Sequence, residues 1–308
     1  MALGEIINSL AMIVFMVLPG FILGRMKIFK NIFYEGLSYF TVNLCIPALI
    51  IHSMQTDYSP ELMLMLAKTF LFWLPMLLIA AVSSFIFTKA FKYGKKQLTL
   101  ALCMLMVPNT GFVGIPLISQ LYGQESLFMA SACEIVGDIF CYSVVFTAIA
   151  IAAGRSTNFS LKNLVVNPPI LALIVGILLF VGNIRLPSFI GTPIEYFSTA
   201  TAPLALFVMG SSLSQLSVKD FLGDKRIYVL CFLRLVFMPF MAFLLVRVLF
   251  KDTSLFSIVF ILMQGMPAAA VTGIVAQTYN SDVDFATKGV MLSTVLCILT
   301  LPVFALIL

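Results

Sequence analysis

The residues best placed to do chemistry lie in an apolar segment that proline and glycine interrupt. The segment reads Pro108-Asn109-Thr110-Gly111, and Pro116 follows within the same apolar run. Each proline removes a helix hydrogen bond, and glycine adds backbone freedom, so a continuous helix is not expected here. An asparagine amide and a threonine hydroxyl donate hydrogen bonds well to a carboxylate. The pattern therefore predicts a broken helix whose neutral polar groups bind a small anion.

A second apolar segment carries a similar interruption at Pro267, Ala268 and Thr272. Lipid cannot satisfy the backbone groups that such a break frees, so both segments must face protein or water. Paired Gly/Pro interruptions in two membrane spans indicate a binding site, and half-helix N-termini direct partial positive charge toward an anion. The alternative is a pair of structural proline kinks.

Three charged residues lie deep within apolar runs. Glu134 and Asp138 are one helical turn apart, and Arg234 lies in a later run. Charges inside a bilayer are costly and are commonly functional. Two carboxylates on one helix face repel each other, which favours a proton or a cation between them. The alternative is a structural pair, bonded to Ser or Thr hydroxyls or to Arg234, which could itself meet a substrate carboxylate.

Five further polar residues have weaker claims. Asn43, Thr199 and Thr201 precede prolines in two other apolar runs. They either line the pocket or bond back to their own helices. Lys68 lies close enough to a helix end to extend its amine into water, and the single histidine, His52, is expected to be structural.

The elements that must position these residues are membrane-spanning helices. The chain has 308 residues, of which 61% are hydrophobic and 10% are charged, against about 25% charged in a soluble domain. All six cysteines lie in apolar runs, which argues against a secreted disulfide scaffold. A span needs about 20 residues, which predicts an all-α membrane protein with ten transmembrane helices. The expected spans are 6–25, 33–53, 62–88, 97–121, 126–153, 168–184, 193–215, 227–249, 255–279 and 284–308.

Charge asymmetry between the loops predicts the orientation. Thirteen of the eighteen Lys and Arg residues follow spans 1, 3, 5, 7 and 9, and only three lie in the opposite loops. By the positive-inside rule, both termini then face outward from a cytoplasmic membrane. These cations orient the protein, so no nucleic-acid partner is expected. No cleavable signal peptide is expected either, since the first apolar run lacks a basic flank.

The two halves of the chain resemble each other, which predicts a repeat of five spans in residues 1–154 and 155–308. Corresponding residues recur at offsets of 156, 159 and 157 residues: Pro47 and Pro203, Pro108 and Pro267, and Tyr122 and Tyr279. A copy that follows an odd number of spans enters the membrane from the other side. The repeat is therefore inverted, as in many secondary transporters.

Several of these motifs resemble the auxin efflux carrier family. The fourth expected span is similar to the family's motif at Pro108-Asn109-Thr110, Gly114-Ile115-Pro116-Leu117 and Tyr122-Gly123. The ninth is similar at Pro267 and at Ala276-Gln277-Thr278-Tyr279-Asn280. The similarity extends over the whole chain, from the end of the first span to the C-terminus.

The resemblance implies two inverted five-helix repeats in which broken spans 4 and 9 cross. It implies a scaffold half of spans 1, 2, 6 and 7 and a transport half of spans 3, 4, 5, 8, 9 and 10, with elevator-type movement. Asn109 matches the family's substrate-binding asparagine, although it could instead cap a half-helix. The chain departs from plant members at three points, which are a short loop after span 5, Gly111 and Thr272. A bacterial-type carrier of malate or malonate is therefore expected rather than an auxin carrier.

The expected function is secondary transport of small organic anions, coupled to protons or to membrane potential. The expected substrate-binding residues are Asn43, Pro108, Asn109, Thr110, Gly111, Pro116, Pro267, Ala268 and Thr272. One alternative is a cation/proton antiporter that uses Glu134 and Asp138, and another is a sensor that binds without transport. Neutral Asn109 and Thr110 favour an anion.

No enzyme site, cofactor or metal centre is expected. A single histidine cannot build a metal cluster, and no Ser or Cys has a plausible base beside it. No Gly-Lys phosphate loop is present in the sequence, so ATP is not expected to drive the protein. The expected partners are the organic anion, protons or Na⁺, the lipid bilayer and, as a homodimer, a second copy of the chain.

Overall fold

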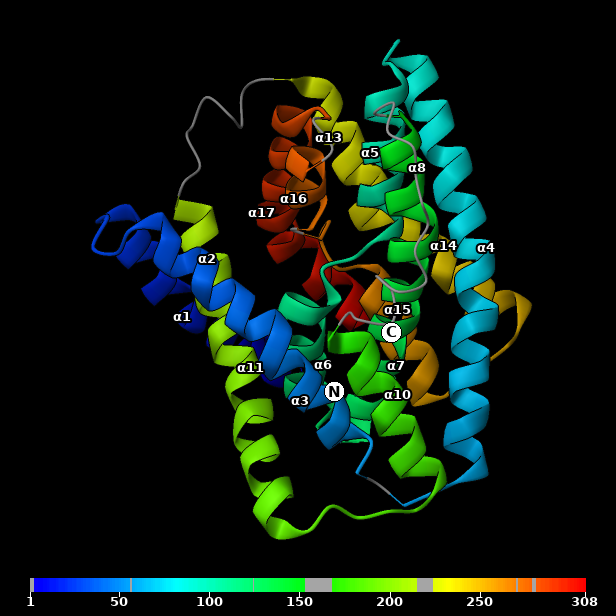
Figure 1. The fold of residues 1–308 in the computed structure, drawn as a ribbon. Coiled ribbons are helices and arrows are strands. Elements are labelled where there is room, and N and C mark those ends of the chain that lie inside the picture. Colours follow the sequence, from blue (N-terminus) through cyan, green and yellow to red (C-terminus); the bar gives the residue numbers. More distant parts are fainter. Residues whose placement is uncertain are drawn as a thin grey trace. The chain divides into compact units, whose positions relative to one another are not determined.

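The computed structural model describes residues 3–55, 57–123, 125–152, 168–214, 224–269, 271–278 and 281–308. In this part of the chain the regular structure is helical, apart from one isolated β-bridge. Figure 1 shows the course of the helices. The prediction of an all-helical protein is confirmed for the described residues.

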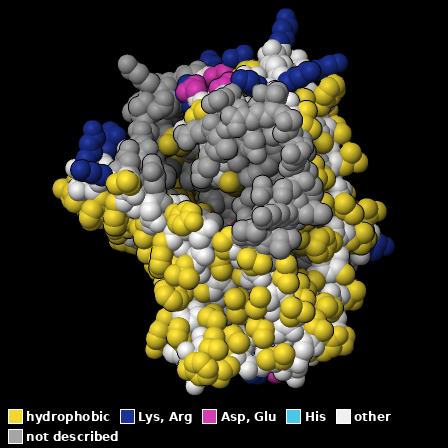
Figure 2. Space-filling model, viewed as in Figure 1, with side chains coloured by type: hydrophobic (Ala, Val, Ile, Leu, Met, Phe, Trp, Pro, Cys, Tyr) yellow, Lys and Arg dark blue, Asp and Glu magenta, His cyan; other side chains and the backbone are white. Residues whose placement is uncertain are grey.

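Four described helical segments are long and apolar enough to cross a membrane. They are Ile32–Ser53, Pro60–Ala90, Lys225–Leu249 and Val283–Ile307. Two shorter apolar stretches, Val14–Arg25 and Leu255–Gln264, are also present. Hydrophobic side chains make up most of the described surface in Figure 2, as a lipid-facing protein requires. The set of ten spans and the inverted repeat stay predictions.

The chain divides into two compact units, and each draws on both halves of the sequence. The first contains residues 1–67, 111–135 and 161–215, and the second contains residues 68–110, 136–160 and 216–308. One boundary falls directly after Thr110, inside expected span 4. The first unit holds the helices of expected spans 1, 2, 6 and 7, together with the second part of span 4 and the first part of span 5. The proposed scaffold and transport halves stay a prediction. The domain boundaries 1–154 and 155–308 stay a prediction.

The first unit is built around the long contact between α1 and α11. Its helices are α1 (Leu3–Arg25), α2 (Asn31–Phe40), α3 (Ile46–Ser53), α6 (Ile115–Tyr122), α10 (Pro168–Val181) and α11 (Ser188–Ser214). A Cβ added to Gly20 would lie 1.9 Å from the Phe207 carbonyl oxygen, and one added to Gly210 would lie 2.0 Å from that of Val17. Glycine therefore lets these two backbones touch, a contact typical of membrane helices.

The second unit gathers helices around α17, which contacts α5, α13, α15 and α16. Figure 1 shows α13, α16 and α17 side by side. The helices are α5 (Lys95–Met106), α8 (Phe146–Ala152), α13 (Lys225–Phe232), α14 (Met238–Phe243), α15 (Leu255–Gln264), α16 (Val271–Thr278) and α17 (Val283–Ile307). Two helices, α4 (Pro60–Ala90) and α7 (Glu125–Phe140), pass from one unit into the other.

Five π-helical segments occur among the described residues, and three of them end two residues before a proline. The segments are Thr41–Cys45, Thr110–Gly114, Cys141–Val145, Leu233–Phe237 and Leu244–Leu249; the prolines are Pro47, Pro116 and Pro239. Proline lacks the N–H that an upstream carbonyl needs in an α-helix. A wider turn shifts the pairing by one residue, as in the bond from the Ile46 N–H to the Thr41 oxygen. A nearby proline thus accompanies the widening in three of these segments.

Polar contacts join the helix ends at one end of the second unit. The Tyr93 hydroxyl donates to Asp224 at 2.7 Å, and the Arg226 guanidinium lies 4.6 Å from the centre of the Tyr93 ring. Gln97 donates to Asp282, which caps α17. Hydrogen bonds from Arg226, and then from Tyr93, hold the pKa of Asp224 well below its usual range. These bonds tie α4, α5, α13 and α17 together at a predicted cytoplasmic surface.

Lys68 pairs with an acid in a loop of the second unit. Its amine lies 3.2 Å from an Asp252 carboxylate oxygen. The Lys68 side chain is 41% exposed and that of Asp252 is 12% exposed. This residue therefore has a structural partner away from the interrupted segments.

Candidate functional site: the crossover of two interrupted helices

The two interrupted segments meet as a short antiparallel pair in the second unit. Pro108 and Ala268 form the isolated bridge. The Asn109 N–H donates to the Pro267 oxygen at 2.7 Å, and the Ala269 N–H donates to the Val107 oxygen at 3.0 Å. Residues on either side of the bridge thus supply each other's backbone partners, which a break inside a membrane requires.

The positions of the prolines explain why the segments break at these points. α5 ends at Met106, and Val107 is extended, as the residue before a proline prefers. Pro108 occupies the non-hydrogen-bonded position of the pair, so its missing N–H costs nothing there. Pro267 contributes only its carbonyl to the pair. The sequence therefore places each proline where no backbone donor is needed.

The side chain of Asn109 has capacity to bind a ligand. The residue is 8% exposed, and no hydrogen bond of its side-chain amide is found among the described residues. Thr110, 5% exposed, has a long 3.5 Å hydroxyl contact with the Pro108 oxygen. In the described part of the chain no helix cap by the Asn109 amide is found.

Arg234 lies beneath the crossover and is 1% exposed. Its Nε donates to the Met266 oxygen at 2.9 Å, Nη1 to the Leu105 oxygen at 2.6 Å and Nη2 to the Gln264 oxygen at 2.9 Å. All three contacts are with main-chain carbonyls. No ion pair between Arg234 and a carboxylate is found in the part of the chain that the structure describes.

Two further side chains support the crossover, and sequence reasoning did not identify them. The Ser293 hydroxyl accepts a hydrogen bond from the Ala268 N–H at 3.1 Å and donates to the Val290 oxygen. The Cys103 sulfur lies 3.4 Å from the Thr272 hydroxyl, which joins α5 to α16. Serine and cysteine are common in membrane helices, so their residue types alone gave no signal.

Gly111 and Glu134 lie against each other in the first unit. A Cβ at Gly111 would lie 2.8 Å from the Glu134 Oε1 and 3.1 Å from the Ile46 Cδ1. Glu134 is 9% exposed and has interactions within the protein. Because Gly111 has no side chain, there is room for the Glu134 carboxylate beside it. The Asp138 side chain lies outside the described residues, so the predicted carboxylate pair is untested.

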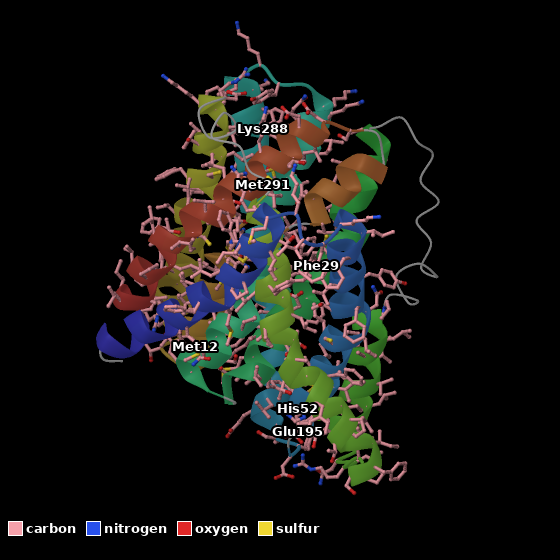
Figure 3. The ribbon with its side chains drawn as sticks, turned by 90° about the vertical axis from the view of Figure 1, so that its left-hand side faces the viewer. Met12, Phe29, His52, Glu195, Lys288 and Met291 are labelled. Carbon is pink, nitrogen blue, oxygen red and sulfur yellow. The ribbon has the colours of Figure 1, made fainter. Side chains whose placement is uncertain are left out.

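A separate pocket of about 200 Å³ lies within the first unit. Its lining includes Pro116 and Ser119 of α6, His52 of α3, and Thr199 and Thr201 of α11. Figure 3 shows His52 and Glu195 toward the same end of this unit. Both threonine hydroxyls bond back to α11 carbonyls. Both threonines therefore line the pocket and also bond back to their own helix, which were the two alternatives that the sequence left open.

The expected site residues fall into separate groups. Pro108, Asn109, Thr110, Pro267 and Ala268 come together at the crossover, whereas Pro116 lines the first-unit pocket. Thr272 is joined to Cys103, and it is fully buried. Asn43 donates its side-chain amide to the Tyr39 oxygen at 2.8 Å, one turn back in its own helix.

Comparison with known proteins decides the family. A family model described as membrane transport protein matches residues 5–305. The chain belongs to this family, that of the auxin efflux carriers. This confirms the resemblance found at the span-4 and span-9 motifs, and it makes the chain a multi-pass membrane protein of a transporter family.

Two archaeal relatives of this membrane transport protein are described as uncharacterized transporters. One, from Methanocaldococcus jannaschii, is 25% identical over 301 residues, which cover 96% of each chain. The other, from Methanothermobacter thermautotrophicus, is 27% identical over 212 residues, covering 68% of this chain and 67% of the relative. Both descriptions agree with membrane transport and name no solute.

Proposed function

We propose that this protein is a secondary transporter that carries small organic anions, such as malate or malonate, across the cytoplasmic membrane. The observation that carries the proposal is the buried Asn109 amide, which has no hydrogen-bond partner among the described residues. A carboxylate would supply acceptors for it. Movement is of the elevator type and is coupled to protons or to membrane potential.

The electrostatics of the crossover support an anion over a cation. The polar side chains at the break, Asn109 and Thr110, are neutral, and α16 begins just beyond Ala269 with its N-terminus. Helix N-termini carry partial positive charge, and broken helices in transporters direct it at anionic substrates. Glu134, held against Gly111, is the proposed proton carrier, together with Asp138.

Uptake of labelled malonate and malate into proteoliposomes tests the proposal. We expect uptake by the wild type to change with an imposed pH gradient or membrane potential. Asn109→Ala removes a hydrogen bond to a charged group, which is worth about 1.5–3 kcal/mol, so we expect uptake affinity to fall roughly 10- to 100-fold. Gln120→Ala, which removes an exposed carboxamide from α6, is the matched control.

Two outcomes would contradict this proposal. Unchanged uptake by Asn109→Ala would show that the Asn109 amide does not bind the substrate. Absence of carboxylate uptake, with proton movement on adding Na⁺ that requires Asp138, would favour a cation/proton antiporter instead. If uptake is retained, loss of its pH-gradient dependence in Glu134→Gln or Asp138→Asn would identify the coupling residue.

A further inference from the structure

The three oxygens that bind Arg234 share a structural role. Leu105 lies in the last turn of α5, Gln264 is the last residue of α15, and Met266 follows two residues later. Each belongs to the C-terminal end of one of the two interrupted helices. Such ends carry roughly half a negative charge each, and their carbonyls lack helical partners.

A single guanidinium therefore bridges two negative helix ends. In transporters with broken helices, half-helix C-termini and unwound carbonyls are the groups that coordinate a coupling cation. Here all three guanidinium nitrogens are engaged with such carbonyls, and Arg234 is buried. The planar fork of arginine reaches several acceptors at once, which a lysine amine cannot match.

We infer that Arg234 is a built-in counter-charge that holds the two half-helix C-termini together and takes the place of a bound coupling cation at the crossover. The inference rests on the proposed anion transport and gives Arg234 a positioning role within it. Arg234 neutralises the negative C-terminal ends of α5 and α15. The positive N-terminal ends of the half-helices then favour a negatively charged solute at the crossover. The crossover then accepts an anion without a co-bound Na⁺.

A disulfide reporter between α5 and α16, the helix that follows the break after α15, measures packing at the crossover and does not depend on any substrate. The Cys103 sulfur is 3.4 Å from the Thr272 hydroxyl, so Thr272→Cys places two thiols side by side between α5 and α16. The other cysteines (Cys45, Cys133, Cys141, Cys231 and Cys297) are replaced by alanine. Copper phenanthroline and oxygen then oxidise the two thiols, and the cross-linking rate is measured.

We expect Arg234→Met to slow this cross-linking at least tenfold, because the two helix ends then repel each other. Arg247→Met, which removes a less buried arginine from the same membrane span, should leave the rate unchanged. Cross-linking of Arg234→Met at the wild-type rate would overturn the inference. If Arg234→Met does not fold, Arg234→Lys replaces it. A slower cross-linking rate is expected in this variant, and an unchanged rate would also overturn the inference.

Chemical rescue distinguishes a counter-charge from a packing role. In Arg234→Ala, methylguanidinium should restore cross-linking, whereas methylurea, a neutral molecule of the same shape, should not at the same concentration. In proteoliposomes, malonate uptake by Arg234→Ala should be lost and then recovered with methylguanidinium, and wild-type uptake should be the same in Na⁺ and in choline. Failure of rescue, or Na⁺-stimulated wild-type uptake, would overturn the inference. Absence of wild-type uptake of both malonate and malate would overturn the proposed function, while the cross-linking rates still test Arg234.

Discussion

At the residue scale, the contact between Gly111 and Glu134 links the interrupted span to a buried acid. A Cβ at Gly111 would lie 2.8 Å from the carboxylate oxygen, closer than two such atoms normally approach. We predict that Gly111→Ala displaces the carboxylate and lowers stability by about 1 kcal/mol, the low end of the cost of overpacking, because the obstructing oxygen ends a flexible side chain. Thermal unfolding in detergent measures the effect, and the pH dependence of uptake reports the displacement.

A second substitution tests whether the carboxylate is the obstacle. Glu134→Asp shortens the side chain by one methylene, so the double variant with Gly111→Ala should regain part of the lost stability. Gly36→Ala is the control, because a Cβ there meets nothing within 4 Å. Additive losses in the double variant would argue against contact between residues 111 and 134.

Residue types at the break were predictable from sequence, whereas their partners were not. Asn109 stood out because an amide between prolines is unusual in an apolar run. The bonds of Arg234 to three carbonyls could not be foreseen, because every residue carries a carbonyl and only the fold selects which ones lack helical donors. An ion pair with Glu134 or Asp138 was the expectation, because the family resemblance places spans 5 and 8 together in the transport half.

At the element scale, Ser293 of α17 connects a neighbouring helix to the crossover. Its hydroxyl satisfies the fully buried Ala268 N–H. We predict that Ser293→Ala lowers stability by about 1–3 kcal/mol, because a buried donor is left without its partner. Ser84→Ala should cost much less, since the bond found for this buried hydroxyl among the described residues is to the Ala80 oxygen of its own helix. Equal losses of stability in the two variants, measured by thermal unfolding, would contradict the assigned role of Ser293.

Proline and glycine predicted the breaks in α5 and α15 correctly, because their backbone chemistry is local. The π-helical segments were not predicted, although three of them precede prolines. A proline shows that an upstream carbonyl loses its donor, yet kinking and widening both resolve that loss. Packing against neighbouring helices selects between them, and packing is not visible in the order of residues.

At the scale of the whole molecule, apolar length identified membrane helices but not the compact units. The boundary after Thr110 divides one expected span between two units. Hydropathy cannot reveal this, because both parts of the span are equally apolar and only tertiary contacts separate them. The inverted repeat likewise rests on three matching offsets in the sequence and stays a prediction.

The orientation of the whole molecule is tested on α4, whose ends carry opposite charges. From Glu61 to Lys89 the helix rises about 42 Å, more than the roughly 30 Å of the hydrocarbon core, so both exposed side chains should reach water. The positive-inside rule places Lys89 in the cytoplasm. We predict that a membrane-impermeant maleimide labels Glu61→Cys in intact cells and labels Lys89→Cys only after permeabilisation. The native cysteines are buried, which keeps the background low. The reverse labelling pattern would place both termini inside.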